Sequence, residues 1–219
     1  MASYDAVVFD NDGVLTTPTD RTVLLEAITA AFERVGVTDP ADEHVETLLG
    51  PTVSSLRRIA TEHAVEPAAL WNARERAAIE AQLGELRAER KRPYEDVTVL
   101  DALDVPTGIV SNNQHETIGN ILDHCELGEF ETWYGREPTI GGIERKKPKP
   151  HYLELAIDDL GAANPLYVGD SRVDVVAADA AGIDSAFLRR ESRLGTPAPT
   201  DPEPAYEIDS LRELSTIVS

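Results

Sequence analysis

The position of the strand-like segments constrains the fold more than any other feature. One apolar segment, YDAVVF, lies at residues 4–9, and comparable segments return only after Pro93. They lie at 107–111, 130–135, 165–170 and 184–188, with helix-length segments between them, including one expected helix at 96–103. Strands that alternate with helices are typical of a parallel sheet covered on both faces. We therefore predict an α/β fold.

The stretch between Arg21 and Arg90 has a helical pattern throughout. Apolar residues recur three and four positions apart in VLLEAITAAFERVG, and further helices are indicated by ADEHVETLL, VSSLRRIATEHA and the stretch that begins at Pro67. We predict a Rossmann-like three-layer core with a parallel sheet, formed by residues 1–16 and 93–219. An all-α cap domain, residues 17–92, is inserted after the first strand, where it can cover the end of that strand as a lid.

The chain carries a large negative charge. Its 219 residues include 40 acidic and 20 basic side chains, which gives a formal charge of −20. This excludes a nucleic-acid-binding protein that works through a general basic surface and argues against docking on anionic membranes. Cys125 is the single cysteine, so an intramolecular disulfide and a cysteine-based zinc site are excluded. Without a signal-peptide pattern or an apolar run of about 18 residues, the expected location is the cytoplasm.

Polar side chains follow three of the predicted strands. In an open parallel sheet, ligands bind outside the carboxyl ends of the strands. Carboxylates that converge there would repel one another and resist ionisation, so a positive charge must offset them. Mg²⁺ with oxygen ligands is the simplest such charge, and the pattern predicts a magnesium site. The residues concerned are Asp10, Asp12, Ser111, Asn112, Asp170 and Asp174.

The few lysines are a second signal. The chain has sixteen Arg but only four Lys, and three of these are Lys146, Lys147 and Lys149, in a segment (137–150) that is expected to be a loop. Prolines at 148 and 150 stiffen this loop and place it just before a helix. A lysine there can reach the site as a point charge that pairs with a carboxylate and a phosphate oxygen. The alternative is a solvated basic loop, which the dipole of the following helix would slightly disfavour.

Four motifs, in this order along the chain, resemble those of the haloacid dehalogenase superfamily. A hydrophobic strand runs into Asp-x-Asp-Gly in VVFDNDGVL, and another strand ends in Ser in GIVSNN. A Lys-Pro-x-Pro loop precedes a helix in KPKP, and VGDSRVD places a second Asp four residues after Gly-Asp-Ser. Each motif alone is weak, but four in order are specific. The resemblance spans residues 4–188 and points to the phosphatase branch with a helical cap, which is phosphoglycolate phosphatase-like or β-phosphoglucomutase-like.

The resemblance implies a role for each core motif. Asp10 would be the nucleophile that attacks phosphorus and forms a phosphoaspartate. Asp12 would protonate the leaving alcohol and then activate water as a base. Ser111 and a backbone N–H near Asn112 would bind the phosphoryl oxygens, while Lys147 would neutralise their charge and keep Asp10 ionised.

The resemblance also implies the metal ligands. Asp10 and Asp170 would bind Mg²⁺ through their carboxylates, and Asp12 through its backbone carbonyl. Asp174 would act in the surroundings of these ligands or through water. The expected cofactor is therefore Mg²⁺.

Two assignments stay open. Lys147 is chosen by the family's Lys-Pro spacing, but Lys149 also precedes a proline. In the cap, Arg57 and Arg58 would bind a carboxylate or a second phosphate on the leaving group, or else belong to an exposed, salt-bridged helix pair. Trp71 is expected to belong to the cap core.

The implied function is a Mg²⁺-dependent phosphatase of a small phosphorylated metabolite, such as phosphoglycolate or a sugar phosphate. The acid at Asp12 supports phosphate-ester chemistry, because a halide leaves without a proton whereas an alkoxide needs one. The alternatives are a phosphomutase that uses the same aspartate and a non-catalytic binding protein on the same fold. The expected partner is a small metabolite, with no nucleic acid and no membrane, and we expect a monomer or a homodimer.

The composition predicts a protein adapted to concentrated salt. High acidity, few Lys, one Met and one Cys fit this interpretation, because at about 1 M salt the Debye length is roughly 3 Å and the self-repulsion of the surface is largely screened. Dialysis into low salt is therefore expected to unfold or inactivate the protein, as followed by circular dichroism and an activity assay. An unchanged melting temperature with full activity in low salt would refute this prediction.

Overall fold

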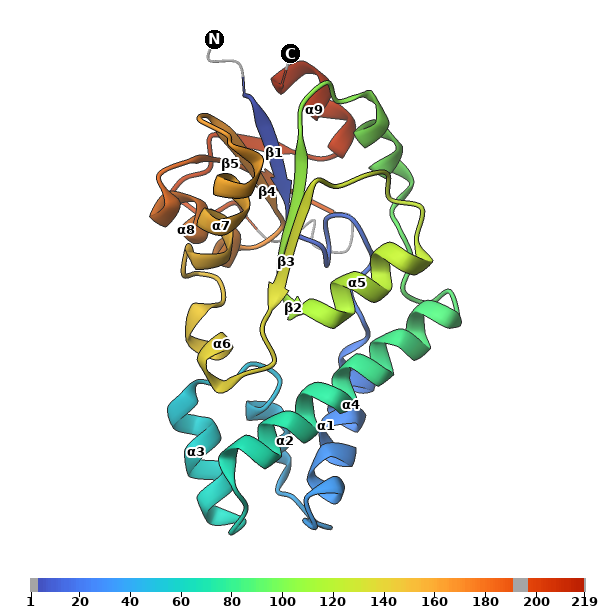
Figure 1. Cartoon of the computed structure of the whole chain (residues 1–219), viewed down its shortest axis with the longest axis vertical. Helices are drawn as coiled ribbons and strands as arrows, with labels where there is room; N and C mark the ends of the chain where they lie inside the picture. The colour runs from blue at the N-terminus through green and yellow to red at the C-terminus, as the bar shows by residue number, and fades with distance from the viewer. Residues whose placement is uncertain (1–3, 191–196, 219) are drawn as a thin grey trace.

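A six-stranded parallel sheet forms the centre of the molecule. The computed structural model describes residues 4–190 and 197–218; residues 1–3, 191–196 and 219, which belong to the predicted core ranges, lie outside the described residues. In the described part of the chain the strand order is β3-β2-β1-β4-β5-β6, and all neighbouring pairs are parallel (Figure 1). The predicted α/β fold is confirmed. The strands are β1 (Ala6–Phe9), β2 (Thr107–Gln114), β3 (Thr132–Arg136), β4 (Pro165–Gly169), β5 (Asp184–Leu188) and β6 (Tyr206–Ile208).

β1 lies in the middle of the sheet. Val7 pairs with Thr107 of β2 on one side and with Leu166 of β4 on the other. All four residues of β1 are buried, as expected for a parallel strand that is covered on both faces. Because the strand order reverses direction at β1, a crevice opens at its carboxyl end, where ligands bind in folds of this kind.

Helices cover both faces of the sheet. Successive side chains of a strand point to opposite faces, and Phe9 and Val8 accordingly belong to two separate apolar clusters. The Phe9 face is covered by α5 (His115–His124), the 3₁₀ helices η1 (Glu95–Ala102) and η3 (Leu211–Glu213), and α9 (Leu214–Ile217). The Val8 face is covered by α7 (His151–Leu160) and α8 (Arg172–Ala181). The predicted three layers are present, and the helix expected at 96–103 is the 3₁₀ helix η1.

Four helices form a unit at the end of the sheet opposite the two termini (Figure 1). Their apolar cluster includes Phe32, Leu56 and Trp71 and is separate from the clusters that cover the sheet. We call these helices the insert and infer that residues 17–92 form the cap domain. Of the helices in the described residues, none combines the length and the apolar character needed to cross a membrane. The helices of the insert are α1 (Arg21–Arg34), α2 (Asp42–Thr47), α3 (Val53–Glu62) and α4 (Pro67–Arg87).

The two segments that connect the insert with the core lie side by side. The Thr17 N–H donates to the carbonyl of Arg92 at 2.8 Å, and the Tyr94 N–H donates to the carbonyl of Leu15 at 3.0 Å. Residues 16 and 93 form an antiparallel bridge between these two hydrogen bonds. The chain therefore leaves and re-enters the core at one place, next to the carboxyl end of β1.

The prediction of a loop over residues 137–150 is wrong for the central part of this segment, where the chain forms helix α6 (Ile140–Arg145). Two glycines conceal this helix in the sequence, because glycine is a poor helix former. The Thr139 side chain caps the helix by accepting from the Gly142 N–H, and Ile143 is buried in the apolar cluster of the insert. A Cβ atom at Gly142 would lie 2.3 Å from the carbonyl of Glu137, so close packing selects the glycine. Tertiary contact with the insert thus outweighs the weak local propensity.

Arg190, at the end of β5, fixes the turn that follows β1. Its buried guanidinium donates to the carbonyls of Gly13 and Val14, and Nη1 lies 2.8 Å from Oδ2 of Asp96. Burial opposes ionisation of Asp96, but its hydrogen bonds from Arg190 and from the Leu211 N–H outweigh this effect and lower its pKa. A lowered carboxyl pKa stabilises the fold at neutral pH, and this stabilisation is lost only as the pH falls through the lowered value.

Replacement of Arg190 by Met is expected to lower the free energy of unfolding by about 3–5 kcal/mol, because the Asp96 carboxylate is left buried without its cation. Denaturant-induced unfolding at neutral pH measures this change. The matched control is Arg189→Met, which removes partly exposed ion pairs worth about 0–1 kcal/mol each. Equal losses in the two variants would contradict the role given to Arg190.

Candidate active site

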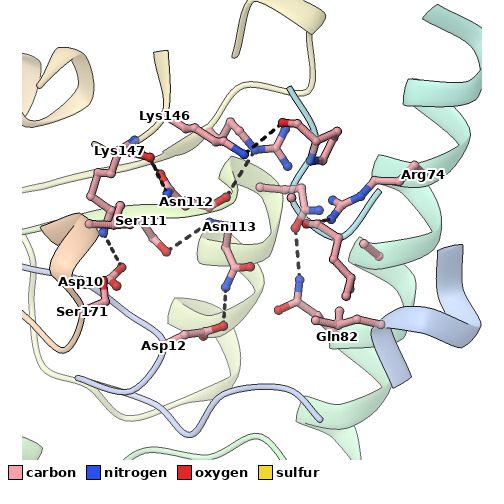
Figure 2. A pocket seen from close by; sticks show the side chains of 18 of the residues that line it. Asp10, Asp12, Arg74, Gln82, Ser111, Asn112, Asn113, Lys146, Lys147 and Ser171 are labelled. Carbon is pink, nitrogen blue, oxygen red and sulfur yellow. Dashed lines mark hydrogen bonds and ion pairs between the residues drawn. The ribbon is translucent and has the colours of Figure 1, made fainter. Parts of the chain in front are cut away.

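The carboxyl ends of β1, β2 and β4 meet at a cavity of about 350 Å³. Residues of α4 and of the loop before α3 line its other side, as Figure 2 shows for Arg74 and Gln82 of α4. Asp170 is buried beside this cavity, with a carboxylate oxygen close to those of Asp10 and Asp174. The structure therefore brings the predicted core residues together. Those that line the cavity are Asp10, Asp12, Ser111, Asn112, Lys147 and Asp174.

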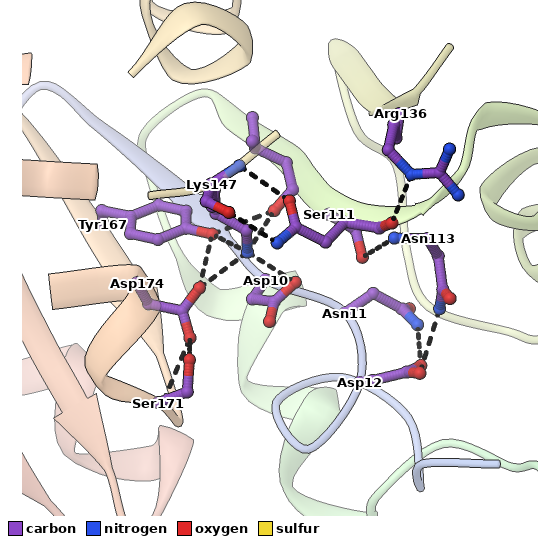
Figure 3. Close-up of polar contacts among 12 residues, drawn as sticks. Asp10, Asn11, Asp12, Ser111, Asn113, Arg136, Lys147, Tyr167, Ser171 and Asp174 are labelled. Atoms are coloured by element: carbon purple, nitrogen blue, oxygen red, sulfur yellow. Dashed lines mark hydrogen bonds and ion pairs between the residues drawn. The ribbon is translucent and has the colours of Figure 1, made fainter. Parts of the chain in front are cut away.

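The Lys147 ammonium lies at the centre of the polar cluster (Figure 3). Its Nζ is 2.9 Å from Oδ1 of Asp10 and 2.7 Å from Oδ1 of Asp174. It also donates to the carbonyl of Val110 at 3.1 Å and to the hydroxyl of Tyr167 at 2.6 Å. With four oxygen partners, this buried cation is fixed in one position between the two carboxylates.

The charges in this cluster are coupled. Burial raises the pKa of Asp10 to about 6, the nearby Asp174 carboxylate adds to the rise, and Lys147 opposes it. Burial disfavours the charge of Lys147, but Asp10 and Asp174 outweigh this effect and raise the pKa of its ammonium. Lys147 is thus charged at neutral pH, and a further cation near Asp10 would favour the ionised form of that carboxyl.

Three carboxylates form a candidate metal site. Asp10, Asp170 and Asp174 each offer an oxygen, and these oxygens lie within 4.8 Å of one another. A Cβ atom at Gly13, whose φ is +83°, would lie 2.0 Å from Oδ2 of Asp170, so only glycine lets this turn approach so closely. A site with oxygen ligands alone suits a hard cation such as Mg²⁺. Asp174 also accepts from the Ser171 N–H at 3.0 Å, and it is therefore oriented by the protein itself.

The Asp12 carboxylate lies apart from this group and has its own donors. Asn11 Nδ2 donates to Oδ1 at 2.6 Å, and Asn113 Nδ2 donates to Oδ2 at 3.0 Å. Lys91 forms an ion pair with Oδ1 and donates to the carbonyl of Thr17 at 3.0 Å. Lys91 is buried, and it belongs to the segment that returns from the insert. Three donors therefore orient the Asp12 carboxylate at the edge of the cavity.

Ser111 and Asn112 lie at an irregularity in β2. The pairing with β3 shifts between Ser111 and Gln114, which is where a bulge re-aims side chains. Ser111 is buried at the cavity, and its Oγ accepts from the Asn113 N–H at 3.2 Å. The side chain of Asn112 accepts from the Lys147 N–H at 2.8 Å and donates to the Lys147 carbonyl at 3.0 Å. Asn112 thus holds the backbone of the loop that carries the lysine.

The remaining predicted residues lie elsewhere. Lys149 is exposed and does not line the cavity. Arg57 and Arg58 are exposed on α3, where Arg58 pairs with Glu62 at 2.8 Å, and neither lines the cavity. The structure therefore separates these three cations from Asp10.

Sequence reasoning missed several residues at this site. Lys91 had a signal in the sequence, since it is one of only four lysines in the chain. In the structure its side chain is buried against Asp12. Arg74 and Arg136 also line the cavity, but nothing in the sequence separates them from surface arginines. Lys146, from the lysine cluster that the sequence singled out, lines the cavity as well. Trp71 is buried in the insert's apolar cluster, as expected, and it also lines the cavity.

Sequence similarity shows to which family the chain belongs. A sequence model of the haloacid dehalogenase-like hydrolases matches residues 4–182, more than half of the chain. The chain belongs to the haloacid dehalogenase-like hydrolases. In this haloacid dehalogenase-like hydrolase, the residues of the four motifs meet at or beside one cavity.

Relatives of this haloacid dehalogenase-like hydrolase match it over different lengths. Phosphoglycolate phosphatase 1 of Pseudomonas aeruginosa is 30% identical over 221 residues, covering 95% of this chain and 77% of the relative. A probable phosphoglycolate phosphatase of Pseudomonas savastanoi is 35% identical over 119 residues, covering 52% of this chain and 71% of the relative. Several further curated relatives match over about half of this chain and only 40–42% of their own length.

A solved structure shares the whole fold. It is a predicted phosphoglycolate phosphatase from Haemophilus somnus, which aligns over 100% of both chains with a TM-score of 0.67 and 19% sequence identity. At this identity the likeness shows the fold of the haloacid dehalogenase-like hydrolases alone.

Removal of the central ammonium is expected to stop the reaction. Lys147→Met should lower hydrolytic activity by at least about 10²–10³-fold, because it removes a preorganised cation from the reacting position. The matched control is Lys149→Met in the same loop, which should keep the activity of the unmodified chain. Circular dichroism checks that both variants are folded. Loss of activity in Lys149→Met alone would show that the other lysine is the functional one.

Proposed function

We propose that this chain is a Mg²⁺-dependent phosphomonoester hydrolase that acts on a small phosphorylated metabolite through a phosphoaspartate. The observation that carries the proposal is the Asp10 carboxylate, held by Lys147 in the cavity and grouped with Asp170 and Asp174. The relatives support the same chemistry, since one is named a phosphoglycolate phosphatase and the other a probable phosphoglycolate phosphatase.

Asp10 is the nucleophile in this proposal. Its carboxylate oxygen forms a bond to phosphorus while the bond from phosphorus to the alcohol oxygen breaks, which splits one difficult displacement into two steps. The Lys147 ammonium faces Asp10 and neutralises charge on the phosphoryl oxygens. Ser111 lines the same cavity and offers a hydroxyl to those oxygens.

Asp12 is the general acid and then the general base in this proposal. It gives a proton to the leaving alcohol and then takes one from the water that attacks the phosphoaspartate. The amides of Asn11 and Asn113 and the ammonium of Lys91 hold its carboxylate at the cavity edge.

The oxygens at this site fit Mg²⁺. Asp10, Asp170 and the Asp12 carbonyl would hold the ion, and Asp174 would act on it through water. When bound, Mg²⁺ supplies positive charge beside the phosphoryl oxygens.

The insert limits the substrate to a small molecule. Residues of α4 and of the loop before α3 close the cavity, whose volume of about 350 Å³ is at the small end of ligand pockets. A covered site excludes water from all but the reacting position. Phosphoglycolate or a sugar phosphate fits these limits.

A screen of phosphorylated metabolites in concentrated KCl, with and without Mg²⁺, tests the proposal. Wild type should release phosphate in the presence of Mg²⁺, whereas Asp10→Asn should release none because it lacks the nucleophile. Asp12→Asn should slow the hydrolysis of an alkyl phosphate by about 10²–10⁴-fold.

Two results would overturn this function. Phosphate release by wild type no faster than by Asp10→Asn, on every ester, would exclude the enzyme. Interconversion of the isomers of a phosphorylated sugar, with phosphate released only from a bisphosphate, would indicate a phosphomutase.

A further inference from the structure

The side of the cavity that faces away from Asp10 carries a cluster of cations. Arg74 of α4, Arg136 of β3 and Lys146 all line the cavity. Figure 2 shows Arg74 and Lys146 at its rim. Among them lies one carboxylate, Glu75, whose Oε1 is 2.7 Å from Nη1 of Arg74 and 2.9 Å from Nη2 of Arg136. Three positive charges surround one negative charge, in a chain with a formal charge of −20.

Two buried donors in this cluster have no hydrogen-bond acceptor in the described residues. They are Nε1 of Trp71, whose side chain lines the cavity, and Nη1 of Arg136. Trp71 is 2% exposed and Arg136 is 4% exposed, so water does not replace the missing acceptors freely. Nη1 of Arg136 lies 2.8 Å from Oε2 of Glu75, but the N–H is not aligned with that oxygen. A buried donor without an acceptor lowers stability, so an acceptor placed in the cavity would be favoured.

Lys146 is the least restrained of the three cations. Among residues 4–190 and 197–218, the one hydrogen bond of its Nζ is a long one to the carbonyl of Pro51, at 3.4 Å. Burial lowers the pKa of Lys146, and the nearby Arg136 and Arg74 lower it further. Burial also lowers the pKa of Arg74. Burial is the main cause of both shifts, and Arg136 adds to both, so an anion in the cavity would favour the charged forms of Lys146 and Arg74.

The cluster is placed to contact the far end of a substrate. Lys146 directly precedes Lys147, and Arg136 Nε donates to the carbonyl of Asn112 at 3.4 Å. A phosphoryl group at Asp10 and Lys147 would therefore leave the rest of a small molecule facing these cations, in a cavity of about 350 Å³. Arg57 and Arg58, the cap residues predicted for this task, do not line that cavity.

We propose that Arg74, Arg136, Lys146 and the Trp71 indole N–H bind a second anionic group, a carboxylate or a phosphate, on the leaving group of the substrate. This inference rests on the proposed function, because it assumes that the phosphoryl group binds at Asp10. Lys146 and Arg136 donate to the anion directly, and Arg74 is held in place by Glu75.

Binding to the Asp10→Asn variant tests this inference without turnover. Isothermal titration with Mg²⁺, at one fixed salt concentration, compares 2-phosphoglycolate, ethylene glycol bisphosphate and 2-hydroxyethyl phosphate. At least one ester with a charged tail should bind about tenfold more tightly than the neutral 2-hydroxyethyl ester, or better. The stronger of the two charged esters shows whether the group is a carboxylate or a phosphate.

A variant of Lys146 identifies the residues. Lys146→Gln in the Asp10→Asn background should weaken binding of the preferred charged ester about tenfold and change binding of the neutral ester much less. Lys149→Gln, which removes the same charge from the same loop outside the cavity, should change neither. Arg136→Gln should have a larger effect than Lys146→Gln and Arg136→Lys a smaller one than Arg136→Gln, with folding checked by circular dichroism.

The outcomes separate this inference from the proposed function. Equal binding of charged and neutral esters, or equal losses for both in Lys146→Gln, would show that the cluster only fastens the insert to the core. No phosphate release by wild type from any ester, together with an intact preference for a charged tail, would refute the proposed function and leave the anion site standing.

Discussion

The structure depends on one ammonium group that is buried among carboxylates. Lys147 lies 2.9 Å from Asp10 and 2.7 Å from Asp174, and Asp170 belongs to the same cluster. Buried ions are costly unless they are closely paired, so the loop that carries the lysine must be held accurately at the sheet edge. The two hydrogen bonds between the Asn112 side chain and the Lys147 backbone do this. One electrostatic requirement, the close pairing of this buried ammonium, therefore fixes the positions of the central strands, the turn after β1 and the lysine loop.

The sequence predicts well those features that local patterns determine. Short apolar segments that alternate with helices predicted the sheet, and the polar residues at their ends predicted the group around Asp10, because parallel strands bring their carboxyl ends to one edge. Helix α6 was missed, since its formation depends on packing of Ile143 against the insert. Arg74 and Arg136 were missed for a similar reason. Whether an arginine faces solvent or a cavity depends on how the insert packs against the sheet. The spacing of residues along the sequence does not predict that contact.

Contacts between the insert and the core are polar as well as apolar. Glu75 of α4 pairs with Arg136 of β3, and Gln82 Nε2 of α4 donates to Oε1 of Gln114 at 3.1 Å. Both contacts are buried and lie at or beside the cavity, so any movement of the insert away from the sheet would break them. A substrate that satisfies Arg136 would compensate part of that loss, which links closure of the site to recognition of its contents.

The paired connecting segments have a consequence for how such a chain can change. Thr17 is hydrogen-bonded to Arg92, and Thr16 is bridged to Pro93. These contacts hold the two ends of the insert together, so the insert is attached to the core in the way a surface loop is. Helices between them can lengthen, shorten or exchange side chains without moving β1. Because Asp10 and Lys147 belong to the core, an enzyme of this design can vary the part of the cavity that the insert forms while these two groups stay where they are.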